Sequence, residues 1–178
     1  MGLASGGYGA REGAAGGDFV GKNPTDRGKP GTKRGVLTDG DGGPLGVMIA
    51  PANTHDSKLI EGIIESVVVD RPDPEEVEQH LCLDKGFDTP DAEAEVIAAG
   101  YEPHIRRIGE EAKPCDRASG HKPRRWVVER TIGWLNRCRA LLVRYDKKGE
   151  NYLGLTQFAC ALLWWRRLCK LCNEPVSG

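Results

Sequence analysis

The sequence lacks two features that direct a chain to or across a membrane: a long apolar run and a signal peptide. Its longest apolar stretch, residues 152–165, spans fourteen residues and contains Gln157, whereas a membrane-spanning helix needs about 20. The first seventeen residues have no charged start followed by an apolar run. We therefore expect a cytoplasmic protein with no membrane partner.

The sequence also lacks the paired cysteines of a disulfide scaffold or a zinc site. Its six cysteines are unevenly spaced, and only Cys169 and Cys172 form a close pair. A structural zinc site needs a second pair of ligands at a similar spacing. Without a secretory leader, reduced thiols are the expected state.

Net charge is nearly absent, at −1, but the two signs are separated along the chain. Residues 61–100 contain twelve acidic and two basic side chains, whereas residues 101–148 contain thirteen basic and six acidic ones. This local asymmetry indicates more about partners than the total charge does.

Glycine is abundant, and seven of the 24 glycines stand in the first seventeen residues. A segment of this composition buries too little apolar surface to offset its ordering entropy. We predict a disordered leader over residues 1–22, one domain over 23–172 and a short tail over 173–178.

Within that domain, hydrophobic periodicity and turn residues predict strands and helices in alternation. Expected strands cover residues 35–38, 44–50, 80–83 and 102–106, and expected helices cover residues 56–69, 90–99, 124–142 and 152–171. This order predicts an α/β chain with a mixed sheet and helices on its faces.

Two carboxylates stand out by position. Asp84 directly follows a predicted strand, and Glu129 lies in a predicted helix four residues after Arg125. Carboxylates so placed are typical of sites that hold two Mg²⁺ or Mn²⁺ ions about 4 Å apart for phosphoryl transfer. The alternative is that Asp84 caps a turn and Glu129 forms an ordinary surface ion pair.

Four sequence blocks, in order, resemble those of bacterial DDE transposases of the insertion-sequence four and five group. The blocks are residues 23–33 (NPTDRGKPGTK), 52–56 (ANTHD), 83–88 (LDKGFD) and 125–137 (RWVVERTIGWLNR). The resemblance implies an RNase H-like core, DNA transposition by strand transfer, a divalent metal and association with the nucleoid. It places the second acidic residue of the family on Asp84 and the third on Glu129, as catalytic and metal-binding residues.

The tyrosine-arginine-glutamate-lysine signature of that family matches in part. Arg125 and Glu129 fit the arginine and glutamate, whereas Lys122 and Asn136 stand at the tyrosine and lysine positions. His55 and Asp56 are candidates for a supporting role near the site, or else cap a helix start.

Basic residues supply the candidate DNA contacts. One group lies in a Gly/Pro-rich loop, which is alternatively a solvated connector, and the other lies around the Glu129 helix. The two groups are Arg27, Lys29, Lys33 and Arg34, and Arg124, Arg125, Arg130 and Arg137. Trp126 and Trp134 on the same helix either pack in the core or stack on an unpaired base.

The first aspartate of the family has no counterpart here. It lies on the first strand, where this sequence has Leu-Ala-Ser-Gly-Gly-Tyr-Gly over residues 3–9, and no acidic residue precedes Glu12. We therefore expect the first strand to be missing or replaced, with Glu12 and Asp18 as the residues to test for the lost carboxylate. The chain is then the second part of a split transposase or a decayed copy.

Three functions follow as hypotheses. The chain is a metal-dependent transposase that is incomplete on its own, a non-catalytic DNA-binding remnant that regulates transposition, or an RNase H-like nuclease with another substrate. The expected partners are DNA, further copies of the chain, or a partner chain encoded by an upstream frame.

Overall fold

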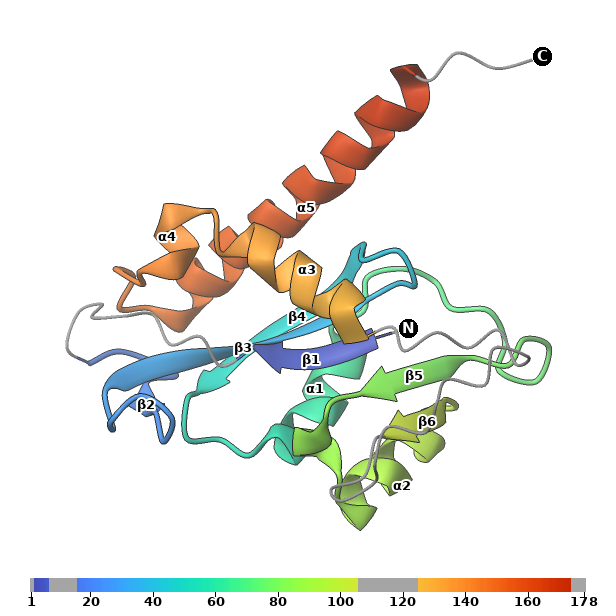
Figure 1. Cartoon of the computed structure of the whole chain (residues 1–178), viewed down its shortest axis with the longest axis horizontal. Helices are drawn as coiled ribbons and strands as arrows, with labels where there is room; N and C mark the ends of the chain where they lie inside the picture. Colours follow the sequence, from blue (N-terminus) through green and yellow to red (C-terminus); the bar gives the residue numbers. More distant parts are fainter. Residues whose placement is uncertain (1, 7–15, 106–124, 174–178) are drawn as a thin grey trace.

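The computed structural model describes residues 2–6, 16–105 and 125–173. These residues form a mixed sheet with helices on both faces (Figure 1). The strands are β1 (Gly2–Gly6), β2 (Gly21–Lys22), β3 (Pro30–Thr38), β4 (Pro44–Pro51), β5 (His80–Leu83) and β6 (Glu102–Ile105). The predicted α/β class with a mixed sheet is confirmed.

The sheet is built around a hairpin and a central β1. Strands β3 and β4 pair antiparallel across the turn at residues 39–43, where Gly42 adopts a φ of 84° that favours glycine. Strand β1 pairs antiparallel with β3 and parallel with β5, and β5 pairs parallel with β6. The main strand order is therefore β4-β3-β1-β5-β6, with the short β2 paired to the start of β3.

Two hydrophobic cores cover the two faces of the sheet because side chains alternate along each strand. On β3, Leu37 belongs to the core under α1 and α2, whereas Val36 belongs to the core under α3 and α5. The helices are η1 (Asp56–Leu59), α1 (Ile60–Glu65), η2 (Lys85–Phe87), α2 (Pro90–Ala98), α3 (Arg125–Leu135), α4 (Arg139–Leu142) and α5 (Gly149–Asn173).

The predicted disordered leader differs from the structure. Gly2–Gly6 forms the central strand β1, and Gly21–Lys22 forms β2. Strand β1 pairs along its whole length with β3, from Gly2 opposite Thr38 to Gly6 opposite Arg34. Backbone hydrogen bonds to both neighbouring strands hold it, and these bonds do not depend on side-chain composition. Of the two alternatives for the first strand, missing or replaced, the structure therefore excludes the first: a strand is present, and its sequence carries no aspartate. Residues 7–15, including Glu12, lie outside the described residues.

Two predicted helices are shorter or broken. The helix expected over 56–69 ends at Glu65, because Ser66 bonds back to Ile63 and the amide of Val68 donates to Leu45 on β4. The helix expected over 124–142 divides into α3 and α4.

The last helix, α5, is longer than predicted. Its first half packs on the sheet through Tyr152 and Ala159, and its second half extends beyond the sheet (Figure 1). In the described part of the chain, no helix is long and apolar enough to cross a membrane.

The five cysteines in the described part of the chain are free thiols. Burial raises the pKa of the Cys160 thiol to about 11, so this thiol is protonated at neutral pH. Cys169 and Cys172 both lie on α5.

Candidate active site and DNA-binding surface

Asp84 lies at the end of β5, on the face of the sheet that α3 covers. Leu81 and Leu83 are buried in the core under α1 and α2. Strand alternation therefore assigns His80 and Cys82 to the opposite face, and Asp84 continues that series. The Asp84 side chain is partly exposed.

Glu129 lies on the side of α3 that faces away from the β3–β4 turn. Val128 is buried toward the sheet, and Thr131 and Arg130 donate hydrogen bonds to the carbonyls of the turn at residues 41 and 42. Successive helix residues are rotated by about 100°, so Glu129 projects from the other flank of the helix, where it is exposed. Because α3 packs across β1 and β3, this flank is on the β1 and β5 side. The fold thus brings both carboxylates to one face.

The strand between them offers no carboxylate. Leu3 of β1 is in register with Leu83 of β5, so Ala4 is the position level with Asp84. Ala4 is also paired with Val36 of β3. Among the described residues, no group of three or more His, Cys, Asp or Glu side chains is arranged to hold a metal ion.

A partly buried ion pair supports the turn that follows Asp84. Lys33 Nζ lies 2.7 Å from Asp56 Oδ1 and donates to the Thr54 carbonyl at 2.8 Å. A Cβ added at Gly86 would clash with the Asp56 carboxylate and displace it, so glycine allows the close approach of η2 to η1. The ion pair therefore helps to position the segment that carries Asp84.

His55 has a local role in the structure. Its ring accepts a hydrogen bond from the Ser57 amide at 3.3 Å as the N-cap of η1, and its Nδ1 lies 2.8 Å from Ser57 Oγ. The side chain is exposed. Of the predicted supporting pair, Asp56 packs against the Asp84 turn and His55 caps a helix.

We expect Lys33→Met to destabilise the fold by about 1–3 kcal/mol, because it leaves the largely buried Asp56 carboxylate without its charged partner. Urea unfolding measures the change. Lys58→Met, which removes an exposed lysine from the same segment, is the matched control and should change stability by about 0.5 kcal/mol or less. Equal effects of the two variants would show that the ion pair does not support this turn.

Comparison with known proteins identifies the family. The family model described as "Transposase DDE domain" matches residues 8–164. The chain is 30% identical over 152 residues to the "Putative transposase for insertion sequence element IS402" of Burkholderia cepacia, covering 84% of this chain and 70% of that protein. This chain belongs to the DDE transposase family. No solved structure matches it.

Family membership establishes a function in DNA transposition, with DNA as the partner. It also confirms the resemblance seen in the sequence blocks. DDE transposases generally use a divalent metal.

Two residues of this transposase that were predicted to contact DNA, Arg34 and Lys33, are bonded to other side chains of the chain. Arg34 is only 3% exposed and donates to the side chain of Asn136, so the prediction that it contacts phosphate is wrong. Arg34 lies on the face of β3 that α3 and α5 cover, and these helices bury it. Lys33 is held by Asp56.

The other predicted contacts differ in exposure. Arg27, Lys29 and Arg137 are exposed. Arg130 is anchored instead, with its guanidinium 4.7 Å from the Trp126 ring centroid and 5.0 Å from that of Trp134. Arg124 lies outside the described residues, and Arg125 is the first residue of α3.

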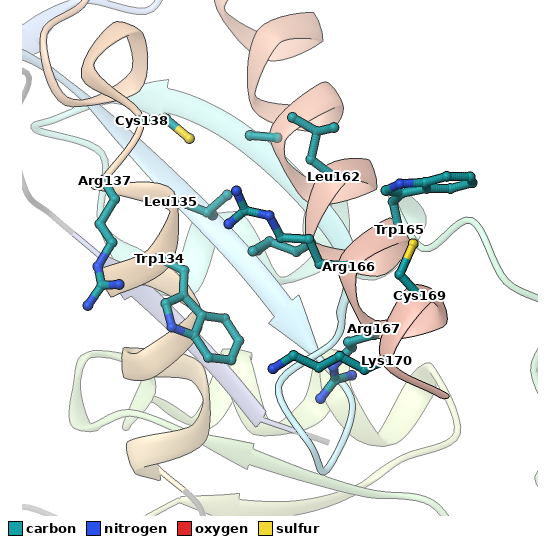
Figure 2. A pocket seen from close by; sticks show the side chains of 12 residues that line it. Trp134, Leu135, Arg137, Cys138, Leu162, Trp165, Arg166, Arg167, Cys169 and Lys170 are labelled. Atoms are coloured by element: carbon teal, nitrogen blue, oxygen red, sulfur yellow. The ribbon is translucent and has the colours of Figure 1, made fainter. Parts of the chain in front are cut away.

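The structure reveals a cationic groove that the sequence interpretation missed. It lies between α3 and α5, has a volume of about 790 Å³, and is lined by Arg137, Arg166, Arg167 and Lys170 among others (Figure 2). The spacing of Arg166 and Lys170 places them on one helix face and is the signal that was available.

Proposed function

We propose that this transposase cleaves DNA at insertion-sequence ends and joins the cut strands to target DNA, with Asp84 and Glu129 as its metal-binding carboxylates. The observation that carries the proposal is that strand and helix periodicity assign both residues to the α3 face of the sheet, on the β1 and β5 side. The strand order, with β1 parallel to β5 and antiparallel to β3, supports the RNase H-like fold that the resemblance implies.

The carboxylate oxygens of Asp84 and Glu129 are ligands that suit a divalent ion, but two carboxylates are one fewer than the three of the family. Carboxylate oxygens suit Mg²⁺ and Mn²⁺, and such ions would activate the attacking oxygen and stabilise the leaving one. Asp84 and Glu129 supply two carboxylate ligands, and β1 supplies no third one. Two carboxylates bind such an ion weakly, so the chain is incomplete on its own and needs a third carboxylate, from Glu12 or from a partner chain.

Asp18 is a poor candidate for that third ligand. Its carboxylate accepts a hydrogen bond from the Gly149 amide at the start of α5, and its own amide donates to the Lys147 carbonyl. These bonds hold Asp18 at the N-terminus of α5, where a negative charge is favourable.

A second function is favoured by the same gap in β1. A chain with the DNA-contacting surface and a deficient metal site would occupy element ends without cutting them, and would act as a regulator of transposition. An RNase H-like nuclease with another substrate remains the third candidate, which activity on RNA–DNA hybrids would reveal.

We expect Asp84→Asn and Glu129→Gln each to weaken Mn²⁺ binding about tenfold or more, because each removes an anionic ligand. Calorimetric titration of the full chain measures binding, and Asp91→Asn, an exposed carboxylate on α2, is the control. Unchanged affinity in both variants would exclude these residues as the metal ligands.

A second experiment measures strand transfer on DNA that carries the element ends, with Mg²⁺ or Mn²⁺ present. The full chain alone is expected to give little strand transfer. Robust transfer that Asp84→Asn abolishes would show that the chain supplies its own third carboxylate, and Glu12→Gln would then be the next variant. Binding of the ends without cleavage under any of these conditions would favour the regulator.

A further inference from the structure

The groove between α3 and α5 has two unlike walls (Figure 2). On the α3 side, the Trp134 ring points toward α5. On the α5 side, Arg166 and Lys170 reach toward α3, while Trp165 extends from the outer flank of the helix. Apolar side chains, including Leu135 and Leu163, complete the lining.

The charge of the groove has one sign. Four cations and no acidic residue line it. Arg167 is partly engaged, because it pairs with Asp39 at 3.3 Å. Across the described part of the chain, Arg137, Arg166 and Lys170 are exposed and none has an ion-pair partner. A surface of this kind attracts a polyanion.

Aromatic and aliphatic groups are exposed beside these cations. Trp165 is 64% exposed and Leu162 is 44% exposed, although residues in the first half of the same helix pack in the core. Cations that follow a phosphate backbone next to indole rings are the features that bind unpaired nucleic acid, since the rings stack on bases. A duplex keeps its bases stacked inside, so the indoles would gain little from it.

We propose that this groove binds an unpaired DNA strand, with its phosphates on Arg137, Arg166 and Lys170, one base against Trp134 inside the groove and another against Trp165 at its outer edge. The proposal rests on the function in DNA transposition and deepens it by naming the form of DNA and the place. Trp134 follows Glu129 by five residues on α3, a rise of about 8 Å. The two side chains are also separated by about 140° around the helix, so the groove lies on the flank of α3 opposite to Glu129.

A protein partner fits the groove less well. The cores of protein interfaces are depleted in charged residues, whereas this groove has four cations among its lining residues. A second copy of the chain would also bring its own cations against them. Charge complementarity thus favours a nucleic acid strand over a protein.

The test measures binding of the full chain to fluorescent oligo(dT) of about 15 nucleotides by anisotropy, with EDTA present. Arg166→Glu/Lys170→Glu should weaken binding more than tenfold and lower the slope of log affinity against log salt by about 1.4, for two lost phosphate contacts. Lys22→Glu/Lys58→Glu makes the same change in net charge at exposed lysines outside the groove and should shift affinity by no more than about twofold.

A second pair of variants tests stacking. Trp165→Ala should weaken binding of the strand about fivefold or more, and Trp165→Phe should restore most of it, because a phenyl ring also stacks on a base. Circular dichroism melts confirm that each variant is folded.

Equal losses in the groove and control variants, or a preference for duplex over single strand, would overturn the proposal. A groove variant that changes the oligomeric mass and leaves strand affinity intact would show a protein interface instead. Because these measurements involve no metal and no cleavage, they are independent of the metal-binding and cleavage tests of Asp84 and Glu129.

Discussion

Ala4→Asp is expected to tighten Mn²⁺ binding about tenfold or more and to produce metal-dependent DNA cleavage in a chain that otherwise gives little. The register of β1 places position 4 level with Asp84, about 4.8 Å away across paired strands. Its partner on β3, Val36, belongs to the core under α3. A carboxylate at this position therefore joins Asp84 and Glu129 on one face and completes a set of three.

Ser5→Asp is the matched control for that variant. It adds the same charge one residue further along β1, where strand alternation turns the side chain to the other face. Calorimetric titration with Mn²⁺ and nicking of supercoiled plasmid are the measurements. If Ser5→Asp gained as much as Ala4→Asp, added charge rather than register would explain the result.

Phe87→Ala is expected to reduce the free energy of unfolding by about 3–5 kcal/mol. Phe87 is fully buried in the core under α1 and α2 and ends η2, the turn that follows Asp84. Its amide donates to the Asp84 carbonyl at 3.0 Å, and its carbonyl accepts from Thr89 at 2.8 Å. The cavity left by the ring would loosen the turn that carries Asp84 as well as the core.

Urea unfolding compares this variant with Ile97→Ala, which truncates a 57% exposed side chain on α2. The control should lose about 0.5 kcal/mol or less of its unfolding free energy from burial alone. Phe87→Leu should recover part of the loss because it refills some of the cavity. A Phe87→Ala loss no larger than that of the control would mean that Phe87 does not anchor this turn.

The elements predicted most accurately depend on local signals. Strand β5 has the predicted bounds, because His80–Leu83 is a short apolar run that ends at a polar turn. Helix α2 begins as predicted at Pro90, and the Thr89 side chain caps it through the Ala92 amide. Each signal lies within a few residues of the element that it specifies.

The elements that differed depend on contacts distant in sequence. Strand β1 is small and Gly-rich, and its neighbours β3 and β5 determine its conformation. The division of α3 from α4 falls where Asn136 accepts a hydrogen bond from Arg34, 102 residues away. The hydrophobic periodicity of residues 124–142 cannot predict a hydrogen bond to a residue so distant in sequence.

The candidate site shows the same division. Asp84 and Glu129 were chosen from a strand end, a helix and a family resemblance, and the fold places them on one face of the sheet. The pairing of Lys33 with Asp56 beneath the Asp84 turn required the packing of η1 on η2, which no spacing in the sequence specifies. The groove likewise required α3 and α5 to be adjacent.

Helix α3 carries residues of two proposed sites, which bind different ligands. Glu129 belongs to the metal site and Trp134 to the groove, and Arg130 and Thr131 fasten the segment between them to the β3–β4 turn. A shift of this single anchored helix on binding at one site would be felt at the other. Linkage makes any such effect reciprocal: the factor by which a DNA strand raises metal affinity is the factor by which the metal raises affinity for the strand.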